Sequence, residues 1–135
     1  KGKSLLINFL PNYFKDNIKL IEQDEERVTY AKKINSKNRR INFNLPSMYI
    51  INQIRAYSNK PGAWFTYKNE RIKIIRAKII SKKSVPSQIM SNQFELGCLD
   101  GCIQPTYLQR EGKKILDIDD FLRGFVFDIG DRLNE

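Results

Sequence analysis

Lysine and arginine are the residues whose type and spacing point most clearly to a chemistry, the binding of anions. The chain has 135 residues and a net charge of +9, and residues 32–83 hold fourteen Lys or Arg against one acid, Glu70. A solvated surface usually mixes its signs, so this block favours a polyanion, above all a nucleic acid, as partner. The alternative is a composition that is rich in lysine throughout, although residues 115–135 carry two bases and six acids.

The groups that usually perform catalysis are missing or have a simpler structural role. The sequence has no histidine, the most usual general base and the commonest metal ligand in proteins. Asp117, Asp119 and Asp120 form a carboxylate cluster, but acids at the start of a helix stabilise its dipole without any catalytic function. We predict that this chain holds no catalytic residue, no metal site and no cofactor of its own.

Two cysteines, Cys98 and Cys102, lie four residues apart around Asp100 and Gly101. A zinc ribbon needs two closely spaced pairs or additional histidines, so this spacing does not predict a metal site. A disulfide across a tight hairpin is possible in an oxidising compartment. The simpler interpretation is a pair of small apolar residues in paired strands, which we expect to be reduced in a cytoplasmic protein.

The amino-terminal stretch predicts an arm rather than a closed domain. Residues 4–14 place apolar side chains at helical spacing, and Pro11 is expected to kink or end this helix. Residues 24–27 form a charged connector, residues 28–34 are expected to be extended, and residues 35–40 to form a polar, basic loop. No stretch approaches the roughly 20 apolar residues that span a bilayer, and the amino terminus lacks the pattern of a signal peptide.

The middle of the chain predicts a small domain of short strands. A helix is expected over residues 46–57, capped by Asn44, and a hairpin is expected to join residues 64–67 to residues 71–74. The apolar alternation then shifts at Ile75, as it does at a β-bulge. Further short strands are expected at residues 88–90, 93–97, 102–104 and 106–109.

A last short helix is expected over residues 118–123, capped by Asp117 and ended by Gly124. Several short antiparallel strands with turns between them are typical of a small barrel. We therefore predict a mainly β fold, a small antiparallel Greek-key barrel of the oligonucleotide-binding kind. A few short helices and an amino-terminal helix with a linker arm complete it.

A series of short motifs along the chain adds to this interpretation. They are Tyr30-Ala31-Lys32-Lys33-Ile34, Arg40-Ile41-Asn42-Phe43, Ile54-Arg55-Ala56, Pro61-Gly62-Ala63-Trp64-Phe65, Arg71-Ile72-Lys73-Ile74, Leu108-Gln109-Arg110-Glu111-Gly112-Lys113-Lys114 and Asp120-Phe121-Leu122-Arg123-Gly124. Each is weak alone, but in this order they make nearly the whole chain resemble the carboxy-terminal half of methionyl-tRNA formyltransferases. One departure is Lys60, where the family pattern leads us to expect an aromatic residue.

The resemblance implies three parts: residues 1–38, the end of a catalytic domain and a linker arm; residues 39–125, the formyltransferase carboxy-terminal barrel; and residues 126–135, a tail. It implies that the catalytic domain, which holds 10-formyltetrahydrofolate, is missing here. This region would bind initiator methionyl-tRNA for its N-formylation in translation initiation. The expected tRNA-binding residues are all cations: Lys32, Lys33, Arg39, Arg40, Arg71, Lys73, Arg76, Lys78, Lys113 and Lys114.

Two alternatives stay open at this point. The domain could be the structural, carboxy-terminal part of a sugar-nucleotide N-formyltransferase, although a small nucleotide-sugar needs no extended cationic surface. It could also be a free-standing nucleic-acid-binding barrel, which would need exposed aromatic residues on its strands for base stacking. Trp64, Phe65 and Tyr67 alternate so that only part of that set can face outward, and the sequence does not predict an oligomeric state.

Overall fold

The computed structural model describes residues 1–15, 17–19, 21–58 and 60–134, which fall into two compact units. The first unit, residues 1–33, contains α1 (Gly2–Tyr13) and a 3-10 helix, η1 (Glu25–Arg27). The predicted first helix is confirmed, and it ends at Tyr13, shortly after Pro11. Within the described residues, no helix is long and apolar enough to cross a membrane.

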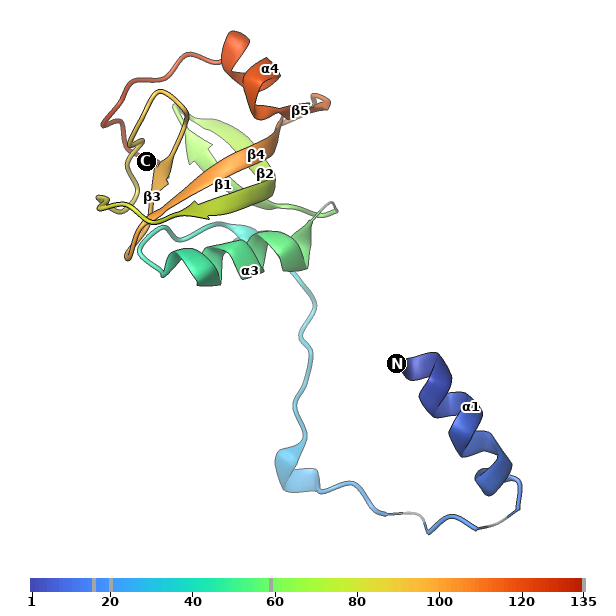
Figure 1. Cartoon of the computed structure of the whole chain (residues 1–135). Coiled ribbons are helices and arrows are strands. Elements are labelled where there is room, and N and C mark those ends of the chain that lie inside the picture. The colour runs from blue at the N-terminus through green and yellow to red at the C-terminus, as the bar shows by residue number, and fades with distance from the viewer. Residues whose placement is uncertain (16, 20, 59, 135) are drawn as a thin grey trace. The chain divides into compact units, whose positions relative to one another are not determined.

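The second unit, from Ile34 onward, begins with a short helix, α2 (Ser36–Arg39), and contains the whole sheet (Figure 1). The sequence predicts a loop here, and that prediction is wrong. Asn35 and Asn38 each accept a hydrogen bond from the other's backbone N–H, at 3.0 and 3.1 Å. Such a reciprocal capping pair satisfies backbone donors at the start of a helix and so closes a turn in a polar segment.

Helix α3 (Ser47–Tyr57) packs Ile50 and Ile54 into the core. The sequence predicts Asn44 as its cap, but the cap comes from elsewhere. The backbone N–H of Ser47 donates to Asp100 Oδ1 at 2.7 Å, and this hydrogen bond lowers the pKa of Asp100. Because the acceptor lies 53 residues further along the chain, no local pattern reveals it.

Strands β1 (Ala63–Tyr67) and β2 (Glu70–Ile80) form the predicted hairpin, which is confirmed. The two residues between them, Lys68 and Asn69, have φ angles of 45° and 63°. A two-residue turn with both residues in the left-handed region matches the twist of the flanking strands, which explains how the hairpin closes without glycine.

Strand β4 (Cys102–Arg110) runs antiparallel to β2 and is a single strand where the sequence predicts two. The gap between the two predicted strands falls at Pro105, which has no N–H to donate to a ladder. Pro105 pairs with Ala77, next to a register shift between Arg76 and Ala77, and another shift lies between Ile74 and Arg76. The predicted bulge in β2 is therefore confirmed, and the proline is tolerated because it sits where the ladder is already irregular.

Two further predicted strands are shorter than expected. Strand β3 (Leu96–Gly97) is the only ladder in the predicted 93–97 segment among the described residues, and Gln88 and Ile89 form isolated bridges with Arg132 and Leu96. Strand β5 (Ile115–Asp117), which the sequence does not predict, pairs with β4.

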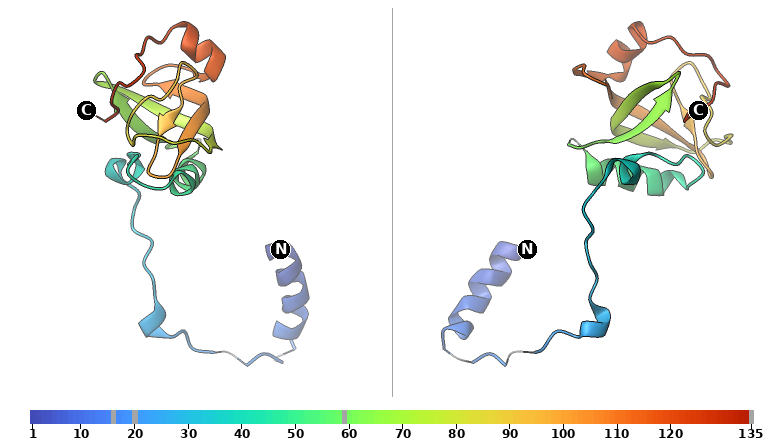
Figure 2. Two further views of the ribbon diagram at one scale, coloured as in Figure 1. Left: turned by 60° about the vertical axis from the view of Figure 1, so that its left-hand side comes forward. Right: turned by 180° about the vertical axis from the view of Figure 1, so that it is seen from behind.

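The sheet has the order β1–β2–β4–β3, with β5 beside β4, and α3 and α4 (Ile118–Arg123) lie on opposite sides of it (Figure 2). The predicted last helix is confirmed, since Asp117 accepts a hydrogen bond from the backbone N–H of Asp120 at 2.9 Å and Gly124 follows the helix. The mainly β, antiparallel fold with few short helices is likewise confirmed. In the described residues no ladder joins β1 to β3, so closure into a barrel stays a prediction.

The core contains a cluster of phenylalanines from distant parts of the chain. The ring of Phe94 lies within 6.4 Å, between centroids, of four others, which belong to Phe65, Phe121, Phe125 and Phe127. Such pairs add to the stabilisation that burial of their large apolar surfaces provides. The cluster joins β1 to the segment after α4.

Cys98 and Cys102 are buried and unlinked, and burial raises the pKa of Cys98 to about 12 and that of Cys102 in the same direction. Since the thiolate is the reactive form, we expect both thiols to react slowly with a disulfide reagent in the folded protein and at once in denaturant. Stopped-flow absorbance with an aromatic disulfide would measure both rates. A fast native reaction of either thiol would contradict this packing.

Candidate nucleic-acid interface

The bulge in β2 decides where its cations point. Side chains alternate along a regular strand, so Arg71 and Lys73 would face away from Arg76 and Lys78 if the strand were regular. The register shifts after Ile74 change this alternation, because Ile72 and Ile74 are buried before the bulge whereas Arg76 and Lys78 are exposed after it. All four cations of β2 therefore reach solvent.

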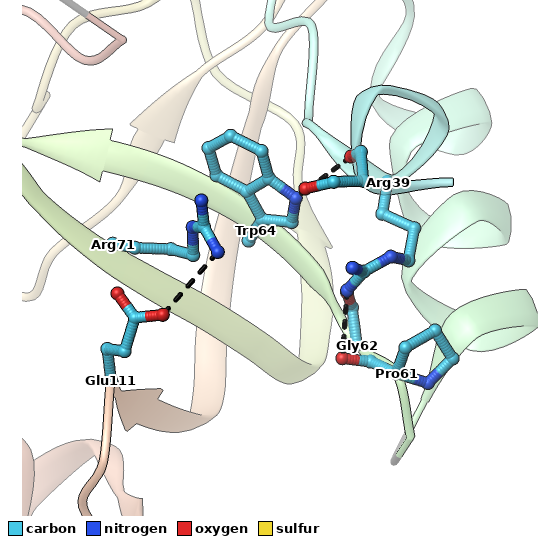
Figure 3. Close-up of polar contacts among 7 residues, drawn as sticks. Arg39, Pro61, Gly62, Trp64, Arg71 and Glu111 are labelled. Carbon is cyan, nitrogen blue, oxygen red and sulfur yellow. Dashed lines mark hydrogen bonds and ion pairs between the residues drawn. The ribbon is translucent and has the colours of Figure 1, made fainter. Parts of the chain in front are cut away.

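The side chain of Trp64 contacts two arginines, Arg71, beside which Figure 3 shows it, and Arg40. Its Nε1 donates to the carbonyl oxygen of Ser36 at 3.1 Å, and the guanidinium carbons of Arg71 and Arg40 lie 4.4 and 5.7 Å from its ring centroid. A cation at such a distance is attracted by the negative face of an indole ring. These contacts hold the two arginines in place. Because Trp64 is only 8% exposed, its ring offers no surface on which a base could stack.

The aromatic residues of β1 do not form a stacking platform. Phe65 is fully buried and Tyr67 is 2% exposed, so both are even less accessible to solvent than Trp64. Of the strand aromatics, Tyr107 on β4 is the more open, at 41%, and the guanidinium of Arg76 lies 5.7 Å from its ring centroid. This arrangement does not favour a barrel that binds single strands by stacking along β1.

Arg39 has a structural task that the sequence does not reveal. Its Nη1 donates to the carbonyl oxygens of Pro61 and Gly62, at 3.1 and 3.2 Å, and so connects α2 to the turn before β1 (Figure 3). Arg40 is similarly engaged, because its Nη2 donates to the carbonyl oxygen of Asn134 at 2.9 Å. The N–H donors of both arginines are therefore partly used within the fold.

Arg71 faces a carboxylate from the turn between β4 and β5. Its Nη1 lies 3.4 Å from Glu111 Oε1, and the two side chains are 39% and 66% exposed (Figure 3). An exposed pair of this kind contributes little to folding stability. It does place a negative charge beside a cation that a phosphate would use.

We expect Glu111→Gln to tighten RNA binding at low salt by roughly twofold to fivefold, because it removes a competitor and a repulsive charge. The free energy of unfolding should hardly change. Fluorescence anisotropy with labelled tRNA would measure the affinity. Glu22→Gln makes the same charge change in the first unit, and an equal gain in that control would show a general charge effect instead.

Arg76 and Lys78 line a hollow between α3 and β2, together with Arg55 from α3. None of these three side chains makes an ion pair or a hydrogen bond with any residue that the structure describes. Arg55 is not among the residues that the charge pattern singles out, although it belongs to the motif Ile54-Arg55-Ala56. Its place beside β2 follows from the packing of α3, which sequence spacing alone does not give.

The other predicted binding residues lie elsewhere. Lys113 and Lys114 are exposed in the turn between β4 and β5, and the carbonyl oxygen of Lys113 accepts from Gln109 Nε2 at 2.7 Å. Lys32 and Lys33 are exposed and belong to the first unit, so they are not placed relative to the sheet. The structure thus places Arg40 and Arg71 on the ring of Trp64, and Lys73, Arg76 and Lys78 further along the same strand as Arg71, but it does not bring all ten residues together.

Several cations outside that group are neutralised by acids. Arg110 Nε lies 2.6 Å from Glu70 Oε1, and this hydrogen bond raises the pKa of Arg110. Lys82 Nζ lies 2.9 Å from Glu95 Oε2, which lowers the pKa of Glu95 and raises that of Lys82. The sheet cations without an ion pair among the described residues are therefore Lys73, Arg76 and Lys78 of β2.

Known proteins resemble this chain over most of its length. A family model described as the formyl transferase C-terminal domain matches residues 33–126. The methionyl-tRNA formyltransferase of Rickettsia typhi is 38% identical over 125 residues, which cover 91% of this chain and 41% of that protein. That of Rhizorhabdus wittichii is 36% identical over 115 residues, covering 84% of this chain and 37% of that protein.

Solved structures agree on the fold. HypX from Aquifex aeolicus, in a crystal structure with tetrahydrofolic acid, matches 93% of this chain and 26% of its own, with a TM-score of 0.63 and 16% identity. At that identity the likeness shows the fold alone. The chain spans about two fifths of the length of the curated relatives above. The resemblance inferred from the sequence motifs is confirmed, and the chain belongs to the formyl transferase C-terminal domain family.

Proposed function

We propose that this chain is the tRNA-binding carboxy-terminal region of a methionyl-tRNA formyltransferase, which positions initiator methionyl-tRNA for N-formylation in the cytoplasm. Formyl transfer from 10-formyltetrahydrofolate would take place in an amino-terminal catalytic domain. The relatives carry the name of that enzyme and are longer than this chain, which supports this division of labour.

The observation that carries the proposal is the row of four solvent-facing cations on β2. Arg71, Lys73, Arg76 and Lys78 reach solvent together only because of the bulge. A row of cations along a strand suits a phosphate backbone, because contacts to phosphates fix the position of a nucleic acid without reading its sequence. A small nucleotide-sugar has too few charges to use such a row.

The chain should bind tRNA weakly and with a steep salt dependence. Each phosphate that a cation neutralises adds about −0.7 to −0.9 to the slope of log affinity against log salt concentration. Filter binding or anisotropy at several salt concentrations would give that slope for initiator tRNA. A flat plot, or no binding at low salt, would contradict the proposal and favour a structural role in a sugar-nucleotide formyltransferase.

A further inference from the structure

The hollow between α3 and β2 has an apolar floor. We call it the α3–β2 hollow; it has a volume of about 560 Å³. Ile51 and Ala77, which are both partly exposed, form the floor, and Ile54 and Ile75 lie beside them almost fully buried. Ser58 Oγ donates to the carbonyl oxygen of Ile75 at 2.9 Å and so joins the end of α3 to β2 beside the hollow.

The rim of the α3–β2 hollow is positive. Arg55 comes from α3, Arg76 and Lys78 come from β2, and no carboxylate is among the described residues that line it. The Arg76 guanidinium is 5.7 Å from the ring centroid of Tyr107, a cation–π contact that restricts its position. None of the three cations makes a hydrogen bond or an ion pair with a described residue, so their N–H donors are available to an anion.

A phosphate group alone would contact the cations of the rim and leave the apolar floor exposed to water. Sites for small organic groups have volumes of roughly 300–1,000 Å³, mostly apolar walls and a few fixed polar groups. A nucleotide combines a flat base with a phosphate, so it fits both parts of the α3–β2 hollow. Bases inside an RNA double helix are stacked and out of reach, whereas unpaired bases can leave the stack.

We propose that the α3–β2 hollow binds one unpaired nucleotide of an RNA strand. The base lies against the exposed parts of Ile51 and Ala77, and the phosphate lies between Arg55, Arg76 and Lys78. This inference rests on the proposed function and extends it, because it assigns to the domain a preference for single-stranded over double-helical segments of its RNA.

The first test compares a short oligouridylate with an RNA duplex that has the same number of phosphates. Arg55→Gln combined with Arg76→Gln should weaken oligouridylate binding roughly tenfold more than it weakens duplex binding. The oligouridylate loses the charged hydrogen bonds of the hollow, whereas the duplex loses only the phosphate contact of Arg76 in the β2 row. Lys37→Gln combined with Lys83→Gln is the matched control, because it removes the same charge from exposed sites outside the hollow. Equal losses for both pairs on both RNAs would overturn the inference.

The second test detects contact with the floor by nuclear magnetic resonance and needs no variant. The methyl resonances of Ala77, Ile51 and Ile54 should shift when oligouridylate is added to the isotope-labelled chain, and they should shift far less with inorganic phosphate. If salt-dependent tRNA binding is present but the floor methyls do not move, this inference fails while the proposed function stands. If no RNA binds at all, both fail.

Discussion

Replacing Arg71, Lys73 and Arg76 together by glutamine is expected to flatten the salt dependence of tRNA binding by up to about three phosphate contacts. These side chains lie on the solvent side of β2, and Lys73 has no hydrogen-bond or ion-pair partner among the described residues. Losing three contacts lowers the affinity by orders of magnitude at low salt and by much less at high salt. The affinities of the original chain and of the triple variant should therefore converge as the salt concentration rises.

The fold should survive this triple change. Arg71 loses its contact with the Trp64 ring and its exposed pair with Glu111, each of which contributes about 1 kcal/mol or less at such sites. Circular dichroism during urea unfolding would verify this. Glutamine at Lys15, Lys37 and Lys83 is the matched control, and an equal flattening there would mean that net charge, rather than the β2 surface, sets the affinity.

Local patterns predict the elements of this domain well where the determinants are neighbours in the sequence. Alternation over residues 64–67 and 71–74 gives the β1–β2 hairpin, and the broken alternation at Ile75 gives the bulge. Asp117 and Gly124 bound α4 because a cap acts within a few residues. The row of cations on β2 follows from the same two observations: the alternation of apolar and charged residues along the strand, and the shift of that alternation at Ile75.

The sequence does not predict contacts between segments that are far apart along the chain. Arg39 looks like another phosphate-binding cation, yet its acceptors at Pro61 and Gly62 lie 22 and 23 residues away. Asp100 caps the helix that starts at Ser47, but in the sequence it is indistinguishable from an ordinary turn residue. Pro105 predicts a strand break, because the irregular pairing of β4 with β2 that tolerates it cannot be read from its sequence neighbours. Each of these outcomes depends on tertiary packing, which periodicity does not encode.

The segment after Phe125 shows the same limitation, since its sequence alone predicts only an acidic tail. Gly130 and Leu133 donate backbone hydrogen bonds to Ile89 and Ser87, each at 2.8 Å. Asn134 donates its backbone N–H to Thr66 O at 2.7 Å and its Nδ2 to Ile41 O at 2.8 Å. The segment therefore joins β1, the approach to β3 and the start of the domain, although the family match ends at residue 126.

Leu133→Ala is accordingly expected to lower the free energy of unfolding by roughly 2–5 kcal/mol, the range for removing a buried leucine side chain from a packed core. Leu133 is 2% exposed within the core cluster, between the hydrogen bonds that anchor the segment. Urea unfolding followed by tryptophan fluorescence would measure the change, since Trp64 lies in the adjoining strand. Ile129→Ala is the matched control: Ile129 is 65% exposed in the same segment, so its truncation should change stability by about 0.5 kcal/mol or less. Equal, small effects of the two substitutions would mean that the segment does not pack on the sheet in solution, and that the formyltransferase domain is complete without it.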